Sequence, residues 1–152
     1  MKQTANSIRE LEAEINQYSA DGMQSDSLFP TLDFEQMTPI DFEHYCAGIL
    51  RNNGWQTKVT KGSGDQGVDI VSEHGDIKAV FQCKKYSNPV GNKAVQEIIA
   101  GKHFEQADFA TVVSNAQFTA SAKQIANIAG VKLLHYSELD NFARELKYLE
   151  NW

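Results

Sequence analysis

The stretch that decides the fold is Gly62–Tyr86, "GSGDQGVDIVSEHGDIKAVFQCKKY". It opens with glycines and two aspartates, and its later apolar run ends in a glutamine and two lysines. Two strand-like segments, 68–73 and 77–86, flank the turn residues "HGD", which predicts a β-hairpin. Charged side chains are seldom fully buried unless they are paired or bind a metal. Acids and a lysine at the ends of these strands therefore call for a chemical explanation.

The patterns on either side of the hairpin predict an α/β fold. Apolar periodicity predicts helices over 38–53, 92–107, 118–130 and 137–152, the last with Ser137 as its N-cap, and strands over 55–60, 108–115 and 131–136. Thr38 is the expected N-cap of the first of these helices, followed by Pro39. A hairpin followed by alternating strands and helices implies a central mixed sheet with helices on both faces.

The chain divides by composition into an N-terminal segment, 1–36, and a main domain, 37–152. Within the first segment, residues 4–20 show helical spacing, which predicts an added amphipathic helix. The residues after it, rich in Gly, Ser, Asp and Pro, are typical of a linker. Only about 37 residues precede the main domain. We therefore expect no separate recognition domain on that side.

Composition restricts the class of protein. The chain has 152 residues, of which 41% are hydrophobic and 22% charged, enough for one domain with a substantial core. No apolar run approaches the roughly 18–20 residues of a membrane span, and the N-terminus has no apolar signal region. The two cysteines lack metal-ligand spacing. We expect a cytoplasmic, reduced protein with no membrane association.

Positive charge is concentrated around the opening stretch. The net charge of the chain is −6, which argues against a generally basic nucleic-acid binder. Residues 51–102, however, carry eight basic and five acidic side chains, whereas 1–50 carry two basic and nine acidic. Chance explains a surplus of this size as readily as function does. The acidic N-terminal part would suit docking of a partner or shielding of the basic surface.

Strand geometry places three polar side chains together. Alternation along the strand puts Gln82 and Lys84 on one face. A hairpin that turns near Gly75 sets Asp69 opposite them. A carboxylate and an amide oxygen are ligands that suit Mg²⁺, which prefers hard oxygen donors. Lys84 would orient or deprotonate a water, or neutralise charge on a phosphate.

These residues carry a resemblance to a known family. The segments that carry it read "FEHYCAGILRNNGW…KGSGDQGVDIV…FQCKKY…PVG…VQEIIAG". They resemble the catalytic domain of Mrr-like restriction endonucleases, in the PD-(D/E)xK nuclease superfamily and in its Asp…Gln-x-Lys form. The resemblance extends from about Thr38 to Leu139. It implies a restriction-endonuclease-like core and a metal-dependent endonuclease that hydrolyses DNA with Mg²⁺, or with Mn²⁺ in its place.

The resemblance also implies roles for individual residues. Asp69, Gln82 and Lys84 would be catalytic, with Asp69 and Gln82 as metal ligands. Glu43 would help to bind the metal, although a carboxylate on a helix surface is as often simply solvated. Asp65 and Gln96 would lie near the site, Asp65 equally as part of a loop turn. Gln82 stands where the superfamily more often has Glu, and a neutral amide lowers the ligand charge.

The sequence also permits other hypotheses about the function of the domain. The domain could be an idle nucleic-acid-binding or scaffolding module, or a ribonuclease or toxin with the same site. Restriction, defence and repair roles would use the same chemistry. Target choice would come from loops, from a homodimer or from a protein partner. Phosphate contacts are expected from five lysines: Lys58, Lys61, Lys85, Lys93 and Lys102.

Overall fold

The computed structural model describes residues 34–61 and 67–149. The helix and linker predicted within 1–36 lie almost entirely outside these residues. The chain divides into two units, 1–37 and 38–152. Of the first unit the structure describes one short 3-10 helix, η2 (Phe34–Gln36).

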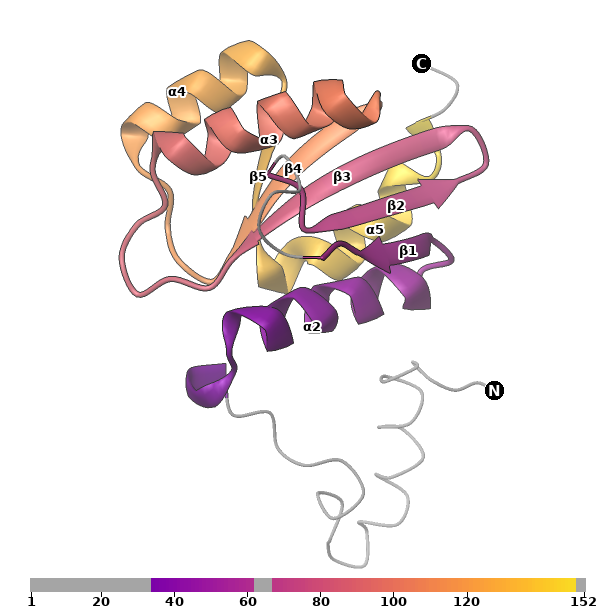
Figure 1. Ribbon diagram of the computed structural model, residues 1–152, viewed down its shortest axis with the longest axis horizontal. Coiled ribbons are helices and arrows are strands. Elements are labelled where there is room, and N and C mark those ends of the chain that lie inside the picture. Colours follow the sequence, from indigo (N-terminus) through magenta and orange to yellow (C-terminus); the bar gives the residue numbers. More distant parts are fainter. Residues whose placement is uncertain (1–33, 62–66, 150–152) are drawn as a thin grey trace, which may run out of the picture. The chain divides into compact units, whose positions relative to one another are not determined.

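A five-stranded mixed sheet forms the centre of the second unit, with strand order β1-β2-β3-β4-β5 (Figure 1). Strands β1 to β3 pair antiparallel, and β3, β4 and β5 pair parallel. The predicted mixed sheet and hairpin are confirmed. The strands are β1 (Gln56–Val59), β2 (Ile70–His74), β3 (Ile77–Lys84), β4 (Phe109–Ser114) and β5 (Lys132–His135).

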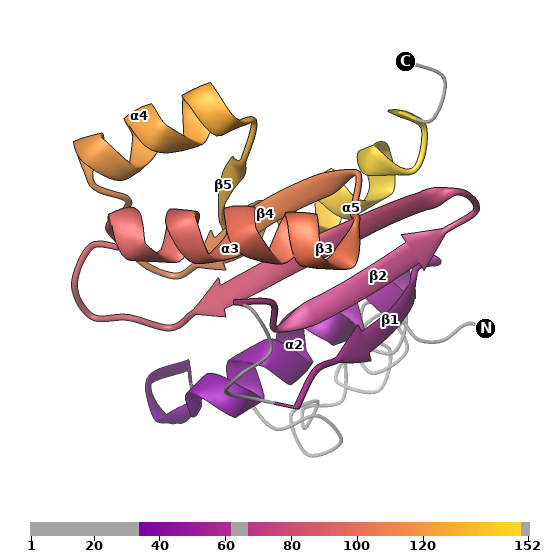
Figure 2. The same ribbon diagram turned by 45° about the horizontal axis from the view of Figure 1, so that its top comes forward.

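Helices cover both faces of the sheet, as predicted. Helices α3 and α4 lie on one face and α2 and α5 on the other (Figures 1 and 2). The helices are α2 (Pro39–Asn52), α3 (Asn92–Glu105), α4 (Ala120–Ala129) and α5 (Leu139–Leu146). The prediction that Ser137 caps the last helix is wrong, because Ser137 lies within the 3-10 helix η3 (Tyr136–Glu138) that precedes α5. No described helix has the length and apolar character needed to cross a membrane.

The alternation of β3 divides its side chains between two cores. Val80 packs with Val95 and Ile98 of α3 and with the apolar side of α4. Phe81, the next residue, points to the opposite face, where Phe42 of α2 is also fully buried. The sheet is therefore buried on both faces at β3. A polar side chain in this strand is removed from water unless it lies near the strand end.

The first turn of α2 is fixed by its own side chains. Thr38 Oγ1 accepts a hydrogen bond from the Asp41 N–H, and Asp41 Oδ2 accepts one from the Thr38 N–H, both at 3.0 Å. This reciprocal pair satisfies two amide groups at the helix start. It also lowers the pKa of Asp41. Thr38 is thus the N-cap that the sequence predicted, and Pro39 is the first helical residue.

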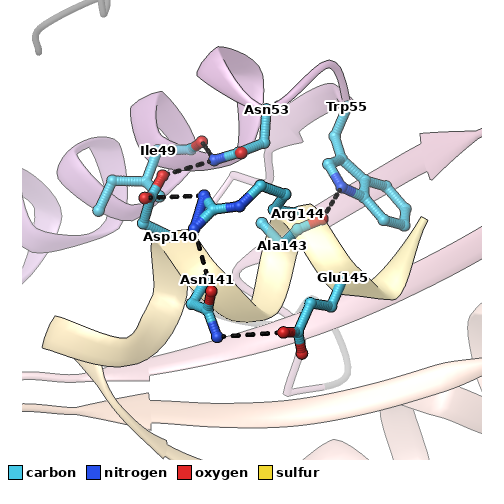
Figure 3. Close-up of polar contacts among 8 residues, drawn as sticks. All are labelled: Ile49, Asn53, Trp55, Asp140, Asn141, Ala143, Arg144 and Glu145. Atoms are coloured by element: carbon cyan, nitrogen blue, oxygen red, sulfur yellow. Dashed lines mark hydrogen bonds and ion pairs between the residues drawn. The ribbon is translucent and has the colours of Figure 1, made fainter. Parts of the chain in front are cut away.

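The other end of α2 is held against α5 by polar contacts (Figure 3). Asn53 Nδ2 donates to the Ile49 carbonyl and to Asp140 Oδ1, both at 2.9 Å. The Trp55 indole N–H donates to the Ala143 carbonyl at 3.0 Å, and Trp55 is only 2% exposed. Trp55 is therefore a core residue. Because α2 is fixed at both ends, its inward side chains have defined positions.

Candidate active site

The hairpin register places Asp69 beside the end of β3. Ile70 pairs with Phe81, and the Asp69 N–H donates to the Phe81 carbonyl at 2.9 Å. The Asp69 carboxylate is fixed as well, because its Oδ2 accepts the Cys83 N–H at 2.8 Å. Thr60 N–H donates to the Asp69 carbonyl from the neighbouring β1 side at 2.9 Å. The acid is thus held by backbone groups on both sides.

Glu43 reaches Asp69 from α2. The pKa of Glu43 is raised to about 7, mainly by partial burial and then by the negative charge and the hydrogen bond of Asp69. The positive charge of Lys84 acts in the opposite direction. The two carboxyl groups are therefore in contact, with the ammonium group close enough to influence them. Two carboxylates in such proximity favour either a shared proton or a bound cation.

The Gln82 side chain is buried, with 3% of the residue exposed. Its Nε2 donates to the Gly67 carbonyl at 3.1 Å and to Glu97 Oε1 at 2.9 Å. Its Oε1 is buried and has no hydrogen-bond partner among the described residues. Buried polar atoms nearly always have a partner, so an oxygen of this kind requires an explanation.

Lys84 lies at the end of β3, with 24% of its side chain exposed. Its Nζ is 3.8 Å from Glu97 Oε1 and 5.6 Å from the centroid of the Tyr86 ring. The main chain of Tyr86 is clamped by Asn115, which accepts from its N–H at 2.8 Å and donates to its carbonyl at 2.9 Å. The ammonium group is therefore confined between an acid of α3 and an aromatic ring.

The oxygen donors fit a hard divalent cation. The carboxylates of Asp69 and Glu43 and the buried amide oxygen of Gln82 are the types of ligand that Mg²⁺ prefers. In the described part of the chain no three His, Cys, Asp or Glu side chains form a group that could hold a metal ion. Cys46 and Cys83 are free and buried, and their mutual hydrogen bond, with burial, raises the pKa of Cys83.

Other residues named from the sequence lie in varied positions. Asp65 lies outside the described residues. Gln96 is exposed on α3. The candidate phosphate-binding lysines lie on several elements: Lys58 and Lys61 are exposed at and after β1, Lys85 and Lys102 are partly buried, and Lys93 is 88% exposed at its side chain.

Glu97 is the residue that the sequence reasoning missed. It contacts both Gln82 and Lys84, whereas its neighbour Gln96 points to solvent. Helical spacing could have identified Glu97. Ala94 and Gly101 are buried on α3, and Glu97 lies three residues after Ala94 and four before Gly101, on the same side of the helix. Position 97 therefore lies on the flank of the helix that faces the sheet.

Comparison with protein-family models identifies the family. A restriction endonuclease model of the Mrr catalytic type matches residues 34–143. The chain belongs to this family of restriction endonucleases. The family predicted from the sequence and the expected fold class are thereby confirmed. Membership of the family supports a nuclease. A comparison with curated proteins found no match.

Solved structures show the same fold. A protein of unknown function, AF1548, is 25% identical, with a TM-score of 0.53, and the match covers 62% of this chain and 56% of that one. The DNA modification-dependent restriction endonuclease AspBHI is 18% identical, with a TM-score of 0.53 and coverage of 96% and 37%. Protein VC1899 from Vibrio cholerae is 13% identical, with a TM-score of 0.53 and coverage of 69% and 32%. The matches thus span between about a third and somewhat over half of those chains.

Proposed function

We propose that this domain is a divalent-metal-dependent endonuclease that hydrolyses phosphodiester bonds in DNA. The observation that carries the proposal is the buried Oε1 of Gln82, which has no hydrogen-bond partner within residues 34–61 and 67–149. It lies at the same strand end as the Lys84 ammonium and the backbone that holds Asp69. The family to which the chain belongs supports both a nuclease and the use of divalent metals. Mg²⁺ is the cation expected, with Mn²⁺ as a substitute.

Three side chains would hold the cation. Asp69 and Glu43 supply carboxylates, and Gln82 supplies the amide oxygen. A bound divalent cation would lower the pKa of a water and neutralise charge that develops on the phosphate. The raised pKa of Glu43 is consistent with such a site, since a cation would replace the proton that the two carboxyl groups otherwise favour.

Lys84 would act on the phosphate or on the attacking water. Its ammonium group is partly exposed and is kept beside the carboxylates by the end of β3. A positive charge at this point stabilises negative charge on the phosphate oxygens in the transition state. It also orients a water by donating a hydrogen bond while that water loses its proton. Attack by the water would form one P–O bond as the P–O bond to the leaving strand end breaks. The proton of the water would pass to solvent, and the leaving oxygen would take up a proton from solvent.

The choice of target is a separate question. AspBHI is described as dependent on DNA modification, but the match covers 37% of its chain, so that property is not carried over. The loops of the domain, a second copy and a protein partner are among the candidate sources of recognition. The five lysines named above would then contact the DNA backbone and position it without reading its sequence.

A cleavage assay tests the proposal directly. Supercoiled plasmid DNA, defined DNA duplexes, single-stranded DNA and RNA are incubated with the full chain, with and without Mg²⁺ or Mn²⁺. We expect DNA cutting that requires the metal and falls by at least about a hundredfold in Lys84→Ala and Asp69→Ala. Lys123→Ala, at an exposed position on α4, is the matched lysine control. Cutting that survives in both site variants would overturn the assignment, and cutting of RNA alone would make the protein a ribonuclease.

A further inference from the structure

One acid on α3 joins the two functional positions of β3. Glu97 Oε1 accepts the hydrogen bond from Gln82 Nε2 at 2.9 Å and lies 3.8 Å from Lys84 Nζ. The other carboxylate oxygen, Oε2, lies 3.9 Å from Lys93 Nζ, one turn earlier on the same helix. The contacts of Oε1 run from helix to strand, so Glu97 links the position of α3 to the site.

Glu97 also determines which atom of Gln82 is available. The two groups around Nε2 are the Gly67 carbonyl and the Glu97 carboxylate, and both are acceptors. If the amide were reversed, its oxygen would face two oxygens, and the arrangement would be unfavourable. Because Nε2 is directed at these acceptors, Oε1 is left as the buried atom with no hydrogen-bond partner in the part of the chain that the structure describes.

The negative charge of Glu97 gives it a second role beside Gln82 and Lys84. Gln82 is neutral and therefore cannot balance the Lys84 ammonium two residues later. Glu97 provides that negative charge from the facing helix, with 35% of its side chain exposed. At this point β3 contributes the amide of Gln82, and α3 contributes the carboxylate of Glu97.

We propose that Glu97 is a positioning residue for the metal site: it orients the Gln82 oxygen towards the cation and supplies the negative charge beside Lys84. The inference rests on the proposed nuclease function. It has a consequence for the Gln at position 82. Replacing Gln82 by Glu, the residue more common in the superfamily, sets two carboxylates where a hydrogen bond of 2.9 Å now exists, next to the Gly67 carbonyl. Like charges at such a distance disfavour each other.

The consequence is tested with four proteins: wild type, Gln82→Glu, Glu97→Gln and the double variant. Thermal unfolding is measured in EDTA, and Mn²⁺ affinity is measured by electron paramagnetic resonance of the free ion. We expect Glu97→Gln to lose at least about tenfold in Mn²⁺ affinity, and Gln82→Glu to lower the metal-free Tm. The double variant should recover most of both losses, because the amide at 97 can donate to the carboxylate at 82.

A matched control separates this role from simple loss of an ion pair between α3 and β3. Glu105, also on α3, pairs with Lys78 of β3 at 3.1 Å, at the other end of the helix and strand. Glu105→Gln should leave Mn²⁺ affinity unchanged. An equal loss in Glu105→Gln and Glu97→Gln would overturn the positioning role.

The remaining outcomes distinguish the inference from the proposed function. If wild type binds Mn²⁺ and cuts DNA but the losses in the double variant are the sum of those in the single variants, the role of Glu97 is wrong and the function stands. The same holds if Gln82→Glu alone matches wild type. If wild type neither binds Mn²⁺ nor cuts DNA, the proposed function fails, and the positioning role fails with it.

Discussion

The Cys83 N–H donates to Oδ2 of Asp69 at 2.8 Å, so the site acid is held by the strand that carries Gln82 and Lys84. The donor is a main-chain group. Substitution of the side chains of Gln82 or Lys84 therefore leaves this contact in place, provided that the hairpin register is kept. The contribution of the Gln82 or Lys84 side chain can thus be tested without removing this contact.

The Glu43 carboxyl group should make the stability of the metal-free protein depend on pH. Its pKa of about 7 in the folded state lies above its ordinary value of 4.5. The protonated form is favoured by folding, so the contribution to stability is complete below about pH 4.5 and is lost as pH rises through 7. Relative to Glu43→Gln, wild type should therefore lose stability over this interval.

Urea unfolding in EDTA at intervals from pH 4.5 to 8 measures this difference. The Gln variant removes the titrating group but keeps its shape, so groups elsewhere cancel when the two proteins are compared. Parallel stability curves for the two proteins would show that Glu43 has an ordinary pKa and that its contact with Asp69 is absent in solution.

Mg²⁺ should stabilise the folded protein. An ion that binds only the folded state stabilises it by about 2.7 kcal/mol when its concentration is a hundred times the dissociation constant. Differential scanning fluorimetry with Mg²⁺, compared with NaCl at equal ionic strength, should show a Tm that rises with metal concentration. Asp69→Asn should abolish the rise, because it removes the charge of the best-fixed ligand. An undiminished rise in that variant would place the cation elsewhere.

Most of the arrangement of the candidate site could be predicted from the sequence because its residues lie largely on a hairpin. The period of two and the turn residues near Gly75 determine the register, and the register sets Asp69 beside β3. A local pattern, Thr38 followed by Pro39, likewise predicted the N-cap of α2. In each case the relevant residues are close in sequence or are paired by the backbone, so pattern alone carries the information.

The contribution of Glu97 depends on how closely α3 approaches β3, which sequence patterns do not give. Gly67 and Glu97 are far apart in the chain, yet a Cβ built on Gly67 would lie 2.5 Å from the Glu97 carbonyl oxygen. The prediction that Gln96 lies near the site rests on its order in the motif and not on the side of α3 that it occupies. Ser137 was similarly misassigned, because a 3-10 turn before α5 shifts the helix start.

Gly67→Ala should destabilise the protein and weaken metal binding. Gly67 has a φ of +75°, which disfavours a side chain, and the added Cβ would clash with the backbone of α3. Gly130→Ala is the matched control, because its φ is +76° but nothing lies within 4 Å of the added atom. We expect the free energy of unfolding to fall by about 1 kcal/mol in Gly130→Ala and by about 3 kcal/mol or more in Gly67→Ala. Urea unfolding measures both, and equal losses would show that α3 does not pack closely on Gly67.

Tyr86 should contribute to DNA binding beside the site. The residue is 42% exposed, and the Lys84 Nζ lies 5.6 Å from the centroid of its ring. Tyr86→Ala keeps the clamp from Asn115, because both of those hydrogen bonds use main-chain atoms of residue 86. An exposed aromatic ring offers a face on which a base can stack, worth about 1–3 kcal/mol. We therefore expect about a tenfold loss of affinity, with Tyr86→Phe close to wild type.

Tyr148 provides the control for this last prediction. It is 70% exposed, and Lys147 Nζ lies 5.9 Å from its ring centroid, so its local environment resembles that of Tyr86. It follows α5, however, and is remote in sequence from β3. Fluorescence anisotropy with labelled DNA in EDTA, where cutting is prevented, compares the two alanine variants at fixed salt. Equal affinities for Tyr86→Ala and Tyr148→Ala would show that the ring beside Lys84 does not contact the nucleic acid, whereas a loss confined to Tyr86→Ala would place the DNA across the end of β3.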